Sequence, residues 1–289
     1  MTIRHLEIFS EVCRKGSVTK AAEVLNMAQP AVSRAIRELE AYYETQLFER
    51  MNRKIYVTET GEELRMYANF ILGQLEEART VVRDRENMVK IRLGVNESCG
   101  RSVLSEWFAG FTKKHPDIPM SININNSKVI EEMLLYNELD IGIIDRPENT
   151  QSFHMKPLME ERMTAVCARD FDVPESVSPE ELERVPMLMR EQGSGLRTHV
   201  EQLFMSSGVR PEIKMESISM QSLIEACRNG LGVLFAPRIT VSALLESGQL
   251  RELEVRTKME RRKYYLVYHK NKYLARSMKI FRDYLLAQD

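Results

Sequence analysis

The 289-residue sequence lacks the long apolar runs and biased composition that define several classes of protein. No uninterrupted apolar run approaches the roughly 18 residues that a membrane-spanning helix needs, so we expect no integral membrane protein. The N-terminal residues do not show the basic-then-apolar pattern of a signal peptide, and we expect a cytoplasmic location. Only 13 glycines and 10 prolines are present, which excludes collagen-like and low-complexity chains.

Cysteine is also scarce, and its spacing excludes two further classes. The four cysteines are widely separated and form no Cys-x-x-Cys pair, and no histidine lies near enough in sequence to complete a zinc site. The sequence therefore predicts neither a small disulfide scaffold nor a metal centre. We expect four reduced thiols, most of them buried.

The sequence has no excess of charge of either sign. It carries 41 Lys and Arg against 42 Asp and Glu, for a net charge of −1. This balance neither indicates nor excludes a nucleic-acid partner, because a small basic face can exist within a neutral total. The length corresponds to about two domains.

The first 43 residues contain three predicted helices. Apolar residues at steps of three indicate an amphipathic helix over 2–15. Ser17 is a candidate N-cap for a short second helix that ends near Asn26, a residue type that tolerates a left-handed turn. A third helix is predicted over 29–43. Two short helices joined by a tight turn form a helix-turn-helix.

The third helix has one face spaced for burial and one face with the chemistry of a DNA reader. Gln29, Ser33, Arg34 and Arg37 lie together on the outward face and offer an amide, a hydroxyl and two guanidinium groups. The alternative is an ordinary solvated face in a small helical bundle.

A predicted β-hairpin follows this helix. Segments 47–50 and 54–57 alternate in polarity around a short turn. As a wing, this hairpin would carry Arg50, Arg53 and Lys54 to phosphates or into the minor groove. The basic hairpin favours the DNA-binding interpretation.

The sequence from Thr58 to about Met88 predicts one long helix. Its apolar residues form a narrow, heptad-like stripe between charged flanks. A helix with such a stripe usually pairs with a second copy, so we expect a homodimer that binds a palindromic DNA site.

Several motifs resemble the N-terminal signature of LysR-type transcriptional regulators. The matching runs are Gly16–Leu25, Ala28–Arg34, Leu47–Arg50 and Thr58–Gly61. The resemblance implies a winged helix-turn-helix over 1–58, a linker and dimerisation helix over 59–89, and an effector-binding domain over 90–289. Dimers or tetramers are common in this family. The predicted DNA-binding residues are Ser17, Thr19, Gln29, Pro30, Ser33, Arg34, Arg37, Arg50, Arg53 and Lys54.

Two positions depart from the usual pattern of this family. Ala28 stands where a capping Ser or Thr is common, which weakens the start of the third helix by about 1 kcal/mol. Glu44 stands where a Gly commonly ends that helix. Neither lies on the outward face.

Strand-like and helix-like runs alternate through residues 90–289, which indicates open, mostly parallel sheets covered by helices. The predicted strands include 120–125 and 213–217. The resemblance implies two hinged Rossmann-like lobes, as in bacterial periplasmic binding proteins. We expect lobe I at about 90–162 and 267–289 and lobe II at about 163–266. The β-rich stretches 161–167 and 264–268 are the candidate crossovers, and the last helix returns to lobe I.

Three turns are candidates for the effector site, because ligands of open α/β sheets bind where strands end and helices begin. They lie at 96–100, 125–127 and 191–195, and the last is followed by Arg197. The predicted effector-binding residues are Ser98, Cys99, Ser127, Gly193, Ser194 and Arg197. The alternatives are helix capping for Ser98 and Ser127, ordinary loop chemistry for Gly193 and Ser194, a packed thiol for Cys99 and a surface ion pair for Arg197.

The leading hypothesis is a sequence-specific DNA-binding transcription factor controlled by a small, anionic effector. No catalytic or cofactor-binding motif is present, so we predict neither an enzyme nor a cofactor protein. RNA polymerase is a candidate partner. The alternative is a two-lobed solute-binding protein or enzyme that does not bind DNA.

Overall fold

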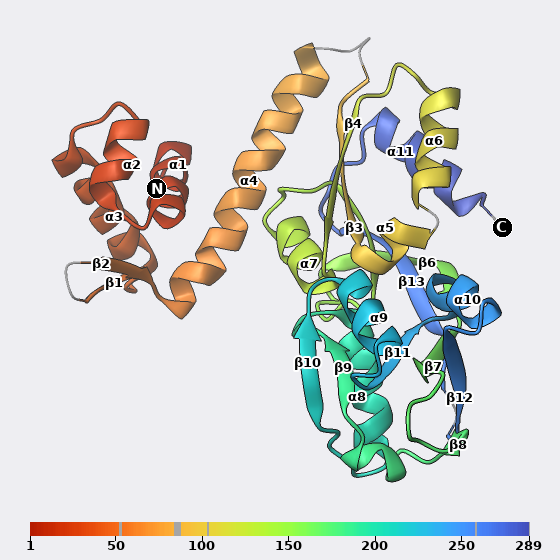
Figure 1. Ribbon diagram of the computed structural model, residues 1–289. Helices are drawn as coiled ribbons and strands as arrows, with labels where there is room; N and C mark the ends of the chain where they lie inside the picture. The colour runs from red at the N-terminus through yellow and green to blue at the C-terminus, as the bar shows by residue number, and fades with distance from the viewer. Residues whose placement is uncertain (52–53, 84–87, 103, 258, 289) are drawn as a thin grey trace.

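The computed structural model describes all residues except 52–53, 84–87, 103, 258 and 289. Figure 1 shows a small N-terminal domain on one side, a long helix beside it, and two α/β lobes stacked on the other side. None of the described helices combines the length and apolar composition that crossing a bilayer requires.

The N-terminal domain is a winged helix-turn-helix. Its elements are α1 (Ile3–Lys15), α2 (Val18–Val24), α3 (Gln29–Tyr43), β1 (Phe48–Met51) and β2 (Lys54–Val57). The two strands pair antiparallel, as the sequence predicts. One apolar core holds the helices and the base of the hairpin together.

The helix ends follow their local sequence. Ser17 accepts a hydrogen bond from the Lys20 N–H (3.3 Å) and caps α2. Asn26 has a positive φ of 51°, which closes the turn before α3. Ala28 precedes α3 without a side-chain cap, and Glu44 ends it in the left-handed conformation (φ 53°).

The long helix α4 (Glu59–Arg83) begins against the wing. The Thr58 hydroxyl donates to the Gln46 carbonyl (2.8 Å) and accepts from the Gly61 N–H (3.0 Å). A side chain at position 61 would collide with the Leu47 carbonyl, which explains why glycine stands there. The predicted part of the helix at 84–87 lies outside the described residues.

Lobe I contains a five-stranded sheet in the order β4-β3-β5-β13-β6. Its strands and helices are β3 (Ile91–Asn96), α5 (Glu97–Ser102), α6 (Leu104–Lys114), β4 (Met120–Asn125), α7 (Ser127–Leu135), β5 (Ile141–Asp145), β6 (Phe153–Glu161), β13 (Arg262–His269) and α11 (Arg276–Leu286). Strand β3 is parallel to β4 and β5, whereas β13 is antiparallel to both of its neighbours. Helix α5 replaces most of the turn expected at 96–100. The sequence also predicts a helix from Val103, a residue that lies outside the described ones.

Lobe II contains a six-stranded sheet in the order β10-β9-β11-β7-β12-β8. Its elements are β7 (Met163–Ala168), β8 (Ser176–Val177), the 3-10 turn η1 (Glu181–Arg184), β9 (Met187–Arg190), α8 (Gly195–Ser206), β10 (Ile213–Ser217), α9 (Met220–Arg228), β11 (Val233–Pro237), α10 (Arg238–Glu246) and β12 (Leu250–Val255). The neighbours of β7 on both sides run antiparallel to it. Both sheets are therefore mixed, where the sequence predicts mostly parallel ones.

The chain crosses between the lobes twice. The first crossing, between β6 and β7, lies at the expected place. The second lies after β12, which ends at Val255, and before β13, which begins at Arg262, because all of β13 belongs to the sheet of lobe I. The predicted boundary at 266 is thus wrong by several residues. The apolar core of each lobe is separate from that of the other.

Candidate DNA interface and effector cleft

The outward face of α3 is available to a ligand. Gln29, Pro30, Arg34 and Arg37 are exposed, and the Arg34 side chain is 76% exposed despite an ion pair with Glu38 (2.7 Å). The Gln29 amide donates to the Ser33 hydroxyl (2.8 Å), so these two polar groups form one unit. An amide, a hydroxyl and guanidinium groups on one helix face match the edges of base pairs.

A groove of about 520 Å³ separates α3 from the wing. Ser33 and Arg37 line it from the helix. Glu40, which the sequence reasoning missed, accepts the N–H groups of Leu47 (3.0 Å) and Phe48 (3.3 Å) and so ties the wing to α3. The sequence signal for this role is the carboxylate of Glu40 itself, about one helical turn after Arg37.

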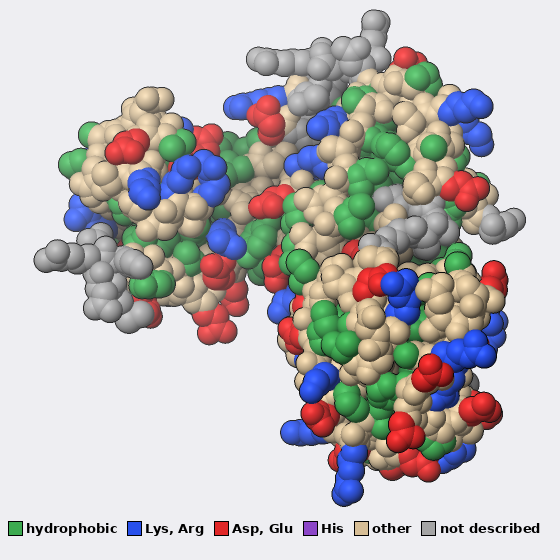
Figure 2. Space-filling model, in the orientation of Figure 1, with side chains coloured by type: hydrophobic (Ala, Val, Ile, Leu, Met, Phe, Trp, Pro, Cys, Tyr) green, Lys and Arg blue, Asp and Glu red, His purple; other side chains and the backbone are tan. Residues whose placement is uncertain are grey.

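The remaining predicted DNA contacts divide into two groups. Ser17 caps α2, and Thr19 lies exposed on the same helix. Arg53 and the side chains of Arg50 and Lys54 lie outside the described residues. In the view of Figure 2, blue and red side chains are interspersed over the surface, in keeping with the near-neutral total charge.

The centre of the cleft is a buried carboxylate that the sequence reasoning missed. Asp145, at the carboxyl end of β5, accepts hydrogen bonds from Ser127 Oγ (2.5 Å), Asn96 Nδ2 (2.7 Å) and Arg262 Nε (2.6 Å). Burial raises the pKa of Asp145, but the Arg262 guanidinium and the two polar donors outweigh it and hold that pKa below its usual value. Asp145 is therefore a carboxylate fixed inside the protein.

Arg262 connects this carboxylate to a second acid. Its Nη1 contacts Ser98 Oγ (3.0 Å) and Glu161 Oε2 (3.5 Å), and Tyr264 donates to the same Glu161 oxygen (2.6 Å). Burial raises the pKa of Glu161. Its Oε1 has no hydrogen-bond partner among the described residues. The buried Arg262 guanidinium thus contacts two carboxyl groups, and the pKa is lowered in Asp145 but raised in Glu161.

The two lobes are closed on each other. Arg190 of lobe II forms an ion pair with Glu97 of lobe I (2.6 Å), and the Lys128 N–H donates to the Gly193 carbonyl (3.4 Å). The tightest approach brings Gly195, the first residue of α8, against the Asp145 carboxylate, where a Cβ would have no room. The protein's own carboxylate therefore occupies the N-terminus of α8.

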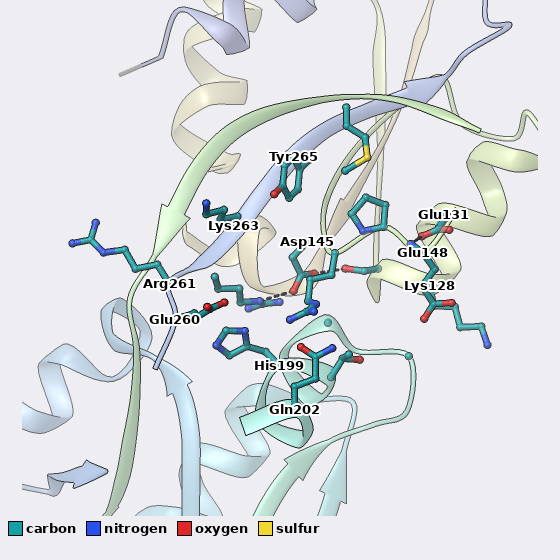
Figure 3. A pocket seen from close by; sticks show the side chains of 18 residues that line it. Lys128, Glu131, Asp145, Glu148, His199, Gln202, Glu260, Arg261, Lys263 and Tyr265 are labelled. Carbon is teal, nitrogen blue, oxygen red and sulfur yellow. Dashed lines mark hydrogen bonds and ion pairs between the residues drawn. The ribbon is translucent and has the colours of Figure 1, made fainter. Parts of the chain in front are cut away.

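A cavity of about 580 Å³ remains in front of this cluster. Figure 3 shows Asp145 at its centre, with His199 and Gln202 below and Tyr265 above. The other charged residues that line it are Lys128, Glu131, Arg146, Glu148, Glu260, Arg261, Arg262 and Lys263. Burial, Arg262 and Arg146 lower the pKa of His199, which favours its neutral imidazole.

Two of the six predicted effector residues line this cavity. Ser127 and Gly193 line it. Ser98 and Ser194 are buried outside its lining; the Ser98 hydroxyl contacts Arg262, and Ser194 makes no side-chain cap on α8. Asn126, not Ser127, caps α7.

Two of the predictions need correction. Arg197 does not line the cavity: its buried guanidinium pairs with Glu201 (2.7 Å) and Glu216 inside lobe II. Cys99 lies in the core of lobe I, and burial raises the pKa of its thiol to about 12. A thiol with that pKa is not reactive, which supports the packed alternative.

Two family profiles cover nearly the whole chain. Residues 3–62 match "Bacterial regulatory helix-turn-helix protein, lysR family", and residues 85–289 match "LysR substrate binding domain". The chain belongs to the LysR-type transcriptional regulators: DNA-binding proteins with an effector-binding domain. The alternative of a two-lobed protein without a DNA-binding function is not supported.

Individual relatives agree with this family. YeiE of Escherichia coli K12, described as an uncharacterized HTH-type transcriptional regulator, is 30% identical over 285 residues, covering 98% of this chain and 97% of YeiE. A full-length variant of OxyR from Pseudomonas aeruginosa has the same fold (TM-score 0.69, 20% identity, 99% and 94% covered). The regulatory domain of Synechocystis PCC6803 CcmR, solved with 2-PG, also matches (TM-score 0.63, 24% identity, 68% and 96% covered).

Proposed function

We propose that this regulator responds to a small anionic effector, bound in the 580 Å³ cavity between the lobes. The observation that carries the proposal is the exposed Arg146 guanidinium in the cavity wall, beside acids that already have partners. Asp145 and Arg262 neutralise each other. Glu131 is occupied by the N–H groups of Glu148 (2.8 Å) and Asn149 (2.7 Å).

Arg146 is the principal candidate for the effector's charged partner. It follows Asp145 in the chain, lines the cavity and is exposed. Its φ of 48° is a left-handed conformation, which costs about 1–2 kcal/mol in a non-glycine residue and tends to occur at functional sites. Among the described residues it has no ion-pair partner. A cation with no partner, held in a strained backbone conformation, favours an anionic ligand.

Uncharged groups supply the remaining recognition. Thr198 and Gln202 line the cavity from α8, beside His199. Hydroxyl, amide and imidazole groups suit the oxygen atoms of a carboxylate or phosphate ester. CcmR, solved with 2-PG, provides a structural analogy for a ligand-bound regulatory domain. The proposed role requires no catalytic step and no cofactor.

We further propose that the protein acts in the cytoplasm as a homodimer or tetramer on a pseudo-palindromic site in double-stranded DNA. Gln29, Ser33 and Arg34 would read bases, and the wing would hold the backbone. On α4, Tyr67 and Val82 are 68% and 70% exposed, which provides an apolar strip for a second copy. RNA polymerase is a further candidate partner of the bound oligomer.

A thermal-shift series tests the effector proposal. Sulfate, phosphate, phosphorylated C2–C3 acids and dicarboxylates are added to the full-length protein and to an Arg146→Gln variant. A ligand present at 100 times its Kd stabilises the native state by about 2.7 kcal/mol. We expect a stabilising anion whose effect is lost in Arg146→Gln but kept in the control Arg210→Gln, another exposed arginine. An unchanged response in Arg146→Gln would contradict the assignment.

A binding experiment tests the DNA contacts. Arg34→Ala should lower the affinity for operator DNA by at least tenfold, since a good base contact is worth about 1–3 kcal/mol. Arg79→Ala on α4 removes an equally exposed, helix-paired arginine and serves as the control. Equal affinities of the two variants would refute the recognition role of Arg34.

A further inference from the structure

Helix α4 has a face that contacts lobe I of its own chain. Leu64 and Ala68 are buried in the core of the DNA-binding domain, whereas Tyr67 and Ile71 are exposed. A third face points to lobe I, and Figure 1 shows α4 between the N-terminal domain and that lobe. The contacts on this third face are separate from the exposed strip proposed for a second copy.

Two aromatic residues of lobe I meet this face. The Tyr136 ring, just after α7, lies 4.6 Å from the Arg65 guanidinium carbon, and its hydroxyl lies 3.4 Å from Glu62. His269, the last residue of β13, lies 4.4 Å from the Phe70 ring, measured between ring centroids. The contacts therefore span two turns of α4 and two separate elements of lobe I.

The closest approach is between Gly73 of α4 and Asn137. A Cβ at position 73 would overlap the Asn137 side-chain amide. Glycine inside a helix is unfavourable, so its place here is explained by the lobe residue that packs on it. Asn137 itself is buried and has a φ of 55°, a conformation that asparagine tolerates and that points it at α4.

Asn137 is anchored to the sheet through buried charges. Its Oδ1 accepts from Lys272 Nζ (2.9 Å), and Lys272 pairs with Asp140 (2.8 Å). Asp140 in turn pairs with Arg92 (2.6 Å) and accepts the Arg92 N–H (2.7 Å). Asp140 directly precedes β5, and Arg92 is the second residue of β3.

The same two strands end at the effector cleft. Strand β3 ends at Asn96 and β5 ends at Asp145, and these two side chains are hydrogen-bonded to each other. One end of the β3–β5 pair is thus fixed to α4 and the other end to the cleft. Because close-packed interiors transmit strain, this hydrogen-bonded pair of central strands provides a direct mechanical connection between α4 and the cleft.

We propose that Gly73, Arg65 and Phe70 of α4, with Tyr136, Asn137 and His269 of lobe I, form a clasp that couples the cleft to the DNA-binding domain. The clasp makes lobe I, α4 and the DNA-binding domain one mechanical body, against which lobe II moves. The regulatory consequence rests on the proposed function, but the clasp itself can be tested without effector or DNA.

Hydrogen exchange measured by mass spectrometry on the full-length protein tests the clasp. In Gly73→Ala the added methyl group displaces Asn137, so exchange should become at least tenfold faster in both 65–75 and 134–140. Without a clasp, Gly73→Ala should slow hydrogen exchange in α4, because alanine stabilises a helix relative to glycine. The double variant Gly73→Ala/Asn137→Gly makes room for the methyl group and should reverse most of the increase.

Peptides from lobe II, residues 163–255, provide the internal reference for folding. If Gly73→Ala also speeds up exchange in lobe II, Tyr136→Ala provides the test. This change removes the contacts with Arg65 and Glu62 without altering the sequence of α4. Faster exchange in 60–70 of that variant supports the clasp. Slower or unchanged exchange at 134–140 in folded Gly73→Ala, or unchanged exchange at 60–70 in Tyr136→Ala, would overturn it.

Discussion

Replacing Arg262 by methionine should strongly destabilise lobe I. Arg262 is 2% exposed, and its partner Asp145 has no exposed surface. Methionine keeps much of the side-chain volume but removes the charge that neutralises Asp145. Because Ser127 and Asn96 can donate only neutral hydrogen bonds, the carboxylate would remain buried without a counter-ion.

Removing one partner of a buried ion pair costs about 3–5 kcal/mol. The loss of unfolding free energy in Arg262→Met should be smaller at acidic pH. In the native protein the pKa of Asp145 is lowered, so the ion pair stabilises the fold above the ordinary aspartate pKa, and this contribution is lost as the pH falls through the folded-state pKa. In the variant the pKa rises, and the penalty shrinks when acid protonates Asp145.

Urea unfolding followed by tryptophan fluorescence measures this loss in the relevant lobe. Trp107 is the only tryptophan and packs against the core of lobe I. The neighbouring Arg261, 71% exposed and 3.9 Å from Glu160, gives the control Arg261→Met, which should lose no more than about 1 kcal/mol. A second change, Asp145→Asn, should recover at least half of the loss in Arg262→Met.

Two results would refute this reasoning. One is a loss in Arg262→Met no larger than that in Arg261→Met, which would mean that water reaches Asp145 in the folded protein. The other is a double variant with Asp145→Asn that is no more stable than the single variant. In that case the lost packing of Arg262, and not its charge, would explain the effect.

Two further predictions concern the same cluster. Gly195→Ala places a methyl group against the Asp145 carboxylate, so lobe closure and any anion-induced thermal shift should be lost. The control Ser206→Ala, at the other end of α8, should leave both unchanged. A normal thermal shift in Gly195→Ala would contradict the closed geometry. Burial raises the pKa of Glu161, so the native state holds its proton more tightly than the unfolded chain does, and the unfolding free energy should fall as the pH rises above the ordinary glutamate pKa. Glu161→Gln should remove that part of the pH dependence in urea titrations, and an unchanged profile would show that Glu161 does not cause it.

Local signals in the sequence predict the elements well. Strands β4 and β10 have the predicted bounds, and the left-handed residue Asn26 lies where the sequence indicates the turn before α3. These features depend on residues close together in the chain, such as apolar alternation and the residue types that tolerate a positive φ. The sequence pattern misplaces the second crossover because β13 is β-rich along its whole length, and only its pairing with β5 assigns it to lobe I.

The centre of the cleft could not be predicted in the same way. Asp145, Glu161 and Arg262 lie in three separate strands, and 117 residues separate the two partners of the ion pair. The predicted turn at 191–195 does reach the cavity, at Gly193, whereas closeness in sequence wrongly suggests Arg197 as a second lining residue. Its actual partners include Glu201, one helical turn away, and Glu216, on a strand whose neighbour is known only from the folded sheet.

The position of the buried cluster indicates how the lobes move. Glu161 is the last residue of β6, directly before the first crossing, and Arg262 is the first residue of β13, directly after the second. Their contact therefore joins the two crossover strands where both enter lobe I. Because separating a buried charge from its partners costs several kcal/mol, we expect these strand ends to stay together during any movement of the lobes. We therefore expect any hinge motion to be confined to Arg162, on the lobe II side of the cluster, and to the described residues between β12 and β13. We expect a ligand that draws lobe II toward Asp145 to rotate it about these short segments while lobe I keeps its shape.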